Sequence, residues 1–124
     1  EANIKKFLGQ EGVEASKIIL GTPFYTRIWT ENNGSVTSKV VNMKNIAKNL
    51  PEGTKTTWDD SLKQNYAEYE KGGKTYKIWI EDAKSLRCKL ELVNTYNLAG
   101  AAYWEKDRET DDIWDMVSEV LNVK

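Results

Sequence analysis

Residues 17–29 read Lys-Ile-Ile-Leu-Gly-Thr-Pro-Phe-Tyr-Thr-Arg-Ile-Trp, and this stretch decides the fold. Its apolar run at residues 18–20 shows no alternation, which predicts a strand buried on both faces, as in a parallel sheet. Gly21 and Pro23 are expected to end that strand, because neither continues a regular ladder well. Three rings and a guanidinium follow within residues 24–29. Barrels and open α/β sheets build their sites at the carboxyl ends of such strands, so the segment predicts a binding site.

The size and charge of the chain exclude several functions. With 124 residues it is long enough for one domain with a real core. The formal net charge is −1, with 18 basic and 19 acidic residues, so no electrostatic footprint for nucleic acid is present. No apolar run reaches the length of a membrane span. We therefore expect neither a nucleic-acid partner nor a membrane partner.

The residue types that are absent narrow the chemistry further. The chain has no histidine and a single cysteine, Cys88. This excludes Ser-His and Cys-His nucleophile pairs, an internal disulfide and a thiolate metal cluster within these residues. We expect no cofactor and no metal. The remaining candidates are carboxylates, arginines and the five Trp and six Tyr residues, a set that suits flat, hydroxyl-rich ligands as well as an ordinary core.

A β-hairpin is predicted around residues 71–74, because Lys-Gly-Gly-Lys is a two-residue-turn signature. Pairing outward from this turn places opposite charges and aromatic rings across from one another, which supports this register. Residues 55–58 are expected to add a third strand. The predicted pairs are Tyr69 with Tyr76, Ala67 with Ile78 and Asn65 with Ile80 on one face, and Glu68 with Lys77 and Tyr66 with Trp79 on the other.

Helices and a second buried strand complete the pattern. Residues 30–36 are polar and turn-rich, and Asn32-Asn33-Gly34 is their clearest turn signal. The expected elements are an opening helix that Gly9 and Gly12 end, a helix over residues 43–50 capped by Asn42 and stopped by Pro51, a helix over residues 82–96 capped by Asp82 that buries Leu86, Leu90 and Val93, a buried strand over residues 98–105, and a last helix after Thr110 with Trp114 in its core stripe.

Three stretches in this order resemble glycoside hydrolase family 18, the chitinase-like enzymes. Residues 17–29 resemble the seventh barrel strand of the family, and residues 98–105, Leu-Ala-Gly-Ala-Ala-Tyr-Trp-Glu, resemble the eighth. Residues 79–85 resemble the segment that enters the last βα unit, particularly in bacterial cell-wall and spore-cortex members. Residues 30–80 match the α+β insertion that many members carry after strand seven.

The resemblance implies roles for four residues. Trp104 matches the tryptophan that floors the subsite holding the reacting N-acetyl sugar. Tyr25 and Arg27 match residues that line the cleft and contact substrate, and Glu105 lies where some members also carry a carboxylate. Thr26 departs from the family, which usually has glycine there, so the path of the chain at this point is open.

The resemblance also implies that this chain is one portion of an α/β barrel enzyme. A (β/α)8 barrel needs roughly 250 residues, and nothing in the chain resembles the family's acid motif D-x-x-D-x-D-x-E. We expect the C-terminal part of a barrel, with residues 1–29 as a helix and strand seven, 30–81 as an α+β insertion, and 82–124 as the last helix-strand-helix. Such a part supplies a wall and floor for substrate-assisted hydrolysis, has no acid for it, and is expected to be inert alone.

Several alternatives stay open at this stage. Tyr66 and Trp79 contact sugar rings if their face lines the cleft, and otherwise only pack across strands. Arg27 contacts substrate or pairs with Glu31 or Glu105 as scaffolding, and Trp29 is interpreted as structural. The competing functions are part of a hydrolase acting on N-acetylglucosamine polysaccharide, a carbohydrate-binding module, and a structural unit.

The resemblance further implies an extracellular, cell-wall or spore location. Its partners are then the polysaccharide and the remainder of the barrel. Two barrel strands without neighbours leave unpaired edges, so we also expect the isolated chain to form a homodimer.

Overall fold

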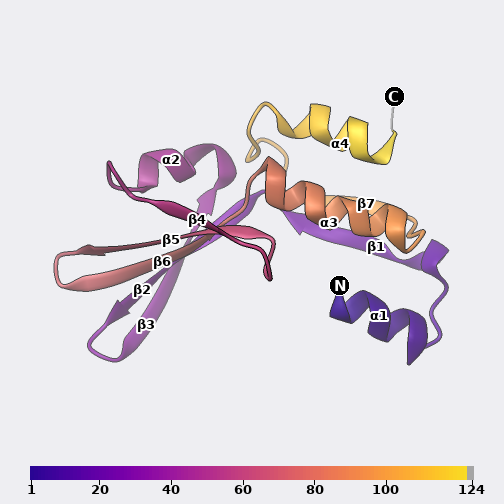
Figure 1. Cartoon of the computed structure of the whole chain (residues 1–124), viewed down its shortest axis with the longest axis horizontal. Coiled ribbons are helices and arrows are strands. Elements are labelled where there is room, and N and C mark those ends of the chain that lie inside the picture. The colour runs from indigo at the N-terminus through magenta and orange to yellow at the C-terminus, as the bar shows by residue number, and fades with distance from the viewer. Residues whose placement is uncertain (123–124) are drawn as a thin grey trace.

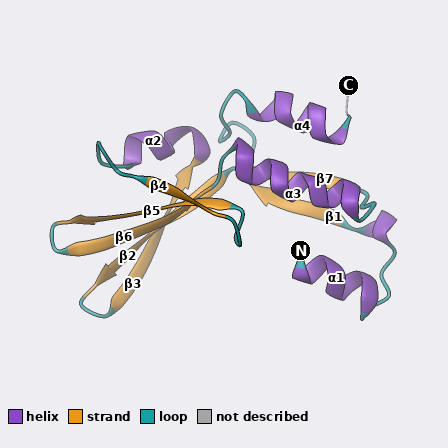
Figure 2. Cartoon of the chain, viewed as in Figure 1, coloured by secondary structure: helices purple, strands orange, loops and turns teal. Residues whose placement is uncertain are grey.

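The computed structural model describes residues 1–122 as two β-sheets with helices packed beside them (Figures 1 and 2). One sheet has two strands and the other has five. In chain order the elements are α1 (Ala2–Gly9), η1 (Ala15–Lys17), β1 (Ile19–Pro23), β2 (Tyr25–Asn32), β3 (Ser35–Asn42), η2 (Met43–Asn45), α2 (Ile46–Asn49), β4 (Thr56–Asp59), β5 (Gln64–Lys71), β6 (Lys74–Ile80), α3 (Ala83–Thr95), β7 (Gly100–Trp104) and α4 (Ile113–Leu121).

The two-stranded sheet pairs β1 with β7 in parallel, as expected from the two apolar stretches. The register runs from Ile19 opposite Gly100 to Pro23 opposite Trp104. The expectation that Gly21 ends the first strand is wrong, since β1 continues through it, whereas the strand does end at Pro23. Pro23 is tolerated because, among residues 1–122, β1 has only one neighbouring strand and needs no further ladder hydrogen bond there.

Neither parallel strand is buried on both faces, which corrects the sequence-based expectation. Ile18 and Leu20 pack inward against a cluster formed by α1 and α3, whereas Ile19 is 63% exposed. On β7, Trp104 is 66% exposed. An apolar run predicts burial, but it does not tell how many helices or strands cover the strand. Within residues 1–122, helices cover one face of this strand pair (Figure 1).

The larger sheet is antiparallel, with strand order β3-β2-β6-β5-β4. The predicted hairpin register is confirmed at every pair, including Tyr66 with Trp79 and Glu68 with Lys77. The third strand expected at residues 55–58 is confirmed as β4. The turn predicted within residues 30–36 is confirmed at Asn33 and Gly34, both with positive φ, and the residues on either side of it belong to strands β2 and β3 of a second hairpin.

The observed helices agree only in part with the helices predicted from the sequence. Helix α3 has the predicted cap, since Asp82 accepts a hydrogen bond from the Ser85 backbone N–H at 2.8 Å. Asn42 does not cap the next segment, which is a 3-10 turn followed by a short α2, and its side chain instead binds Arg108. Trp114 is 41% exposed, so it lies at the border of the core rather than inside it.

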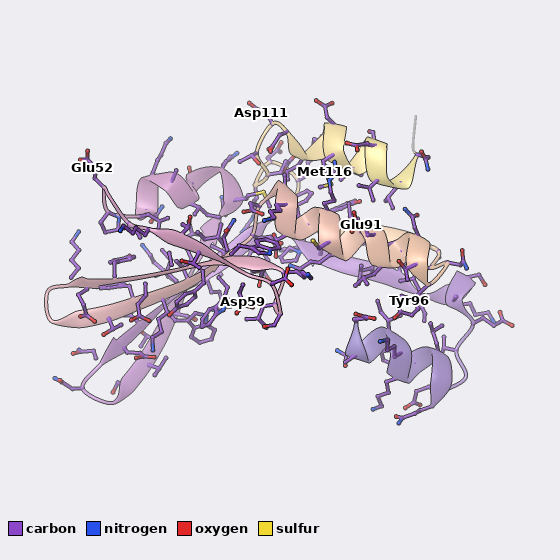
Figure 3. All side chains as sticks on the ribbon, viewed as in Figure 1. Glu52, Asp59, Glu91, Tyr96, Asp111 and Met116 are labelled. Atoms are coloured by element: carbon purple, nitrogen blue, oxygen red, sulfur yellow. The ribbon has the colours of Figure 1, made fainter. Side chains whose placement is uncertain are left out.

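Helices α1 and α4 pack on either side of α3. Tyr96 lies between the end of α3 and α1 (Figure 3), where its hydroxyl donates to a Glu1 carboxylate oxygen at 2.6 Å. Met116 is buried between α4 and α3. No helix in the described residues is both long and apolar enough to cross a membrane.

Phe24 joins the two sheets. Its backbone N–H donates to the Trp104 carbonyl at 2.7 Å, and its own carbonyl accepts from the Met43 N–H at 3.0 Å. The ring is fully buried, stacks on Tyr103 at 5.1 Å between centroids, and meets Trp114 edge-on at 5.6 Å. One hydrophobic core therefore runs from the five-stranded sheet to α3 and α4. This shared core fixes the carboxyl ends of β1 and β7 relative to β2.

Candidate functional site

A hollow of about 340 Å³ lies at the carboxyl ends of β1 and β7. It brings together Trp104 and Tyr25, two of the residues that the sequence predicted to share a site. Both side chains reach it because Trp104 ends β7 and Tyr25 begins β2, one residue after the Phe24 junction. The hollow, named here the first hollow, is lined by Gly21, Thr22, Pro23, Tyr25, Ala102, Tyr103 and Trp104.

Small residues in β7 leave this hollow open. Ala102 lies opposite Gly21 across the strand pair, so no bulky side chain closes the space between the two strands. The Thr22 hydroxyl donates to the Ala102 carbonyl at 3.3 Å and holds the strands together below it. The Trp104 indole is then presented as an exposed flat surface beside Tyr25, which is the shape that a planar or ring-shaped ligand needs.

Arg27 does not form the ion pair with Glu31 or Glu105 that the sequence left open as its scaffolding role. Its guanidinium donates from Nη1 to the Ser38 hydroxyl at 2.8 Å on the neighbouring strand. Glu31 instead forms an ion pair with Lys77 at 2.8 Å. Arg27 is exposed and lies on the same face of β2 as Tyr25, because alternate residues of a strand share a face. It therefore remains available to a ligand.

Glu105 directly follows Trp104 and pairs with Arg108, whose Nη2 lies 2.8 Å from Oε2. The pairing of Glu105 with Arg27, one of the alternatives that the sequence left open, is therefore not found. Thr26, which replaces the family's usual glycine, is buried on the opposite face of β2 and donates its hydroxyl hydrogen to the Trp79 carbonyl. The Thr26 side chain is thus accommodated inside the sheet, on the face away from Tyr25 and Arg27.

Tyr66 and Trp79 lie together on the outer face of the five-stranded sheet. Their ring centroids are 5.0 Å apart with a 49° tilt, so the predicted cross-strand contact is present. The Tyr66 hydroxyl donates to Glu68 at 2.5 Å. Burial of the hydroxyl, followed by this hydrogen bond to a carboxylate, raises the pKa of Tyr66 to about 12. The phenol therefore stays neutral at ordinary pH and serves as packing surface rather than as an acid or base.

Trp29, which the sequence led us to interpret as structural, is partly exposed in the fold. It lies on the same outer face, 38% exposed, and a second hollow of about 420 Å³ opens beside it. The alternation of Tyr25, Arg27 and Trp29 in the sequence is a signal that these residues share one face of a strand. The predicted strand nevertheless ended at Trp29, because the residues after it were interpreted as a turn. This second hollow is lined by Trp29, Glu31, Val36, Lys77 and Trp79.

Glu81 is a buried acid away from both hollows. Its carboxylate accepts from Ser85 Oγ at 2.5 Å and Gln64 Nε2 at 3.2 Å, and it pairs with Lys89. Burial is the largest cause of its raised pKa, and Lys89 opposes that effect. These contacts tie α3 to the end of β6, so Glu81 is a structural residue. Within residues 1–122, no three or more acidic, cysteine or histidine side chains cluster as metal ligands.

Comparison with known proteins identifies the class of enzyme. Residues 1–109 match the sequence profile of glycosyl hydrolases family 18. The chain is 25% identical over 113 residues to the cortical fragment-lytic enzyme of Bacillus subtilis (strain 168), covering 88% of this chain and 26% of that protein. The chitinase of Chromobacterium violaceum superposes with a TM-score of 0.79 at 26% identity, over 92% of this chain and 36% of that one.

A spore cortex-lytic enzyme of Bacillus megaterium, SleL, has the same fold over 89% of this chain and 27% of its own, with a TM-score of 0.74 at 24% identity. Over the length that it shares with these proteins, the chain therefore has the fold of the family's TIM-barrel members. The chain belongs to glycosyl hydrolase family 18. It spans between 23% and 31% of the length of the curated relatives it matches.

Proposed function

We propose that this chain forms the C-terminal part of a (β/α)8 barrel, with β1 and β7 as its seventh and eighth strands. The parallel pairing of β1 with β7, and the helix α3 that precedes β7, support this assignment. Residues 1–29 then supply a helix and strand seven, residues 30–81 the α+β insertion, and residues 82–124 the last helix-strand-helix. Within residues 1–29, only β1 forms the barrel strand in this proposal, because residues 25–29 already pair in the five-stranded sheet as the start of β2.

The function proposed for the complete enzyme is hydrolysis of a polysaccharide that contains N-acetylglucosamine, such as chitin or peptidoglycan. The observation that carries this proposal is the first hollow, where Trp104 and Tyr25 meet at the carboxyl ends of two parallel strands in a family 18 chain. Its relatives include a cortical fragment-lytic enzyme and a sporulation-specific glycosylase. A cell-wall or spore-associated, extracellular place of action is proposed accordingly.

Each exposed side chain of the site receives a role in this proposal. Trp104 is the floor on which a sugar ring lies, Tyr25 is the adjoining wall, and Arg27 donates hydrogen bonds to the sugar. Glu105, held by Arg108, borders the floor. Hydrolysis in which the substrate's own N-acetyl oxygen replaces an enzyme nucleophile still requires an acid. Residues 1–124 contain no D-x-x-D-x-D-x-E motif. The proposal therefore assigns substrate binding to this chain and proton donation to another part of the enzyme.

Tyr66 and Trp79 are proposed as additional sugar-contacting residues. Their paired rings lie on the same face of the five-stranded sheet as Arg27, since alternate positions of antiparallel neighbours share a face. Cross-strand packing covers part of each ring and leaves the rest available.

The proposal is tested by titrating the chain with a soluble N-acetylglucosamine trisaccharide and monitoring binding through the change in tryptophan fluorescence. Trp104→Ala is expected to weaken binding about tenfold, or about 1.4 kcal/mol, since it removes the floor. Trp58→Ala is the matched control, because Trp58 lies on β4 under the Lys84 ammonium at 3.6 Å and away from the hollow. The chain alone is expected to release no product from the trisaccharide. Hydrolysis by the isolated chain, or equal binding by wild type and Trp104→Ala, contradicts the assigned roles.

A further inference from the structure

Strand β3 forms one edge of the five-stranded sheet, and among residues 1–122 no strand pairs with its outer side. The opposite edge is β4, which has only four residues, and short edge strands offer little backbone for pairing. Strand β3 has eight residues, contains no proline and carries a single charged side chain, Lys39. A long edge with so little charge is a surface on which another strand can pair.

The free backbone groups of this edge belong to Val36, Ser38 and Val40. The pair that flanks a two-residue hairpin turn exchanges both backbone hydrogen bonds, and every second pair of the β2–β3 ladder does the same. Met43 follows this alternation, since its N–H donates to the Phe24 carbonyl at 3.0 Å. Odd-numbered residues of β3 therefore bond to β2, whereas the N–H and C=O groups of the even-numbered residues point to the open edge.

The side chains at the same positions are apolar and exposed. Val36 is 59% exposed and Val40 is 43% exposed. Ser38 lies between them on the same face of the strand and accepts a hydrogen bond from Arg27. Strands gain stability when β-branched side chains such as valine meet one another across a ladder. The edge therefore has both the backbone groups and the side chains that strand pairing uses.

One antiparallel register of β3 with a second copy of itself satisfies these features together. A twofold axis at Ser38 pairs this residue with Ser38 of the second copy, and Val36 with Val40 of the second copy. Each of these pairs joins residues whose backbone groups point outward, so both hydrogen bonds of the pair can form. Lys39 then lies opposite Thr37 of the second copy. Its ammonium donates to the Asn49 side-chain oxygen at 3.2 Å within its own chain.

Other registers are less favourable. A shift by one residue sets outward-pointing groups against residues whose groups already bond to β2. A shift by two residues in one direction places Lys39 opposite Lys39 of the second copy, and like charges directly opposite one another destabilise a ladder. The same shift in the other direction places Val40 opposite Gly34, which lies in the hairpin turn outside the strand.

We propose that the open edge of β3 binds a second copy of this chain, antiparallel and about a twofold axis at Ser38, and so joins two five-stranded sheets into one. The occupant is a second copy because the edge is complementary to itself, with valine opposite valine and the charged residue opposite Thr37. The inference goes beyond the proposed function. The turn of the β2–β3 hairpin points away from β1 and β7, so this pairing leaves the two parallel strands free for the remainder of the barrel (Figure 1).

Cysteine trapping tests the position of the axis. In a Cys88→Ser chain, Ser38→Cys places two thiols across the axis, where paired Cα atoms are roughly 5.5 Å apart and within reach of a disulfide. Ser35→Cys is the matched control, because Ser35 lies roughly 10 Å from the axis along the strand and roughly 20 Å from its copy. With oxidised glutathione, Ser38→Cys is expected to form a disulfide-linked dimer much faster than Ser35→Cys. Equal rates overturn the proposed pairing.

Sedimentation equilibrium measures the same contact without a cross-link. The pairing involves few residues, so the association is expected to be weak and is followed up to high protein concentration. Every chain carries Ile19→Lys, which removes the contribution of the parallel pair. Val40→Lys and Val36→Lys are each expected to weaken self-association about tenfold, because each alters two symmetry-related pairs. Leu62→Lys is the control, since Leu62 is similarly exposed at 54% but lies between β4 and β5.

Three outcomes of sedimentation overturn the inference. The first is a chain with Ile19→Lys alone that stays monomeric at every concentration. The second is an association that neither valine substitution weakens. The third is an equal loss in Leu62→Lys, since the association then follows exposed apolar surface in general rather than the edge of β3. None of these measurements involves a sugar, so each of these results leaves the proposed function standing.

Discussion

The guanidinium of Arg108 donates from Nη1 to the Asn42 side-chain oxygen at 3.3 Å and so connects the loop after β7 with the end of β3. The same guanidinium holds Glu105 through Nε at 3.0 Å and Nη2 at 2.8 Å. Asn42 lies opposite Tyr25 in the β2–β3 ladder, and Glu105 follows Trp104. Arg108 therefore links the immediate neighbours of the two aromatic residues that form the first hollow.

Replacing Arg108 by alanine is expected to lower the free energy of unfolding by about 1 kcal/mol, because this is the typical contribution of a partly exposed hydrogen-bonding group to stability. Arg108→Lys is expected to recover only part of it, because lysine lacks the planar fork that reaches Asn42 and Glu105 together. Urea unfolding measures both. Arg87→Ala, which removes a more exposed pair with Glu119, is the control and is expected to cost less. A larger loss for Arg87→Ala would show that Arg108 has no special linking role.

Phe24 is expected to be the most sensitive position in the core. Phe24→Ala removes a fully buried ring that packs on Tyr103 and Trp114, and such truncations cost about 3–5 kcal/mol. Phe7→Ala is the matched control, since Phe7 on α1 is 48% exposed, and is expected to cost under about 1 kcal/mol. Thermal or urea unfolding gives both values. Similar costs for the two substitutions would contradict the role of Phe24 as the junction of the two sheets.

Glu81 predicts a pH dependence of stability. Its folded-state pKa is raised above the ordinary value of 4.5, mainly by burial. Below that ordinary pKa, folded and unfolded chains both hold the proton. As the pH rises from there through the folded pKa, the unfolded state releases the proton first, so the contribution of Glu81 to stability falls.

Glu81→Gln removes this titration and is expected to flatten that part of the profile. Unfolding midpoints measured at a series of pH values from acid to neutral check it. Glu119→Gln is a useful comparison, because the Arg87 hydrogen bond lowers the pKa of Glu119 and gives the opposite sign. An unchanged profile in Glu81→Gln would show that the buried carboxyl does not control this dependence.

The exposed edges of the parallel pair predict self-association of the isolated chain. Among residues 1–122, β1 and β7 each pair on one side only, and Ile19 is 63% exposed on their open face. Unpaired strand edges with apolar side chains tend to pair with another copy. We expect a dimer in light scattering at raised concentration, weakened in Ile19→Lys. A monomer at every concentration tested would contradict this expectation.

Local sequence signals predicted much of the antiparallel sheet and of α3. The Lys-Gly-Gly-Lys turn and the period-2 pattern fix the β5–β6 register, because a slip of one residue would send every side chain to the wrong face. Asp82 likewise predicted the start of α3, since a helix cap and its backbone partner lie within one turn of the chain. The turn at Asn33 and Gly34 was also predicted, but the strands on either side of it were not, because polar residues on an edge hairpin lack a clear apolar alternation.

The sequence by itself determined that two apolar stretches pair in parallel and that Trp104 and Tyr25 lie at the same end of that pair, because strand order and chain direction follow from local patterns and from a family resemblance. Only the tertiary structure decided that Arg27 binds Ser38, that Phe24 joins the two sheets, and that Trp29 opens a second hollow. Each of these depends on which face of a distant strand meets which side chain. Packing across the whole core decides which side chains meet, and no short segment of the sequence contains that information.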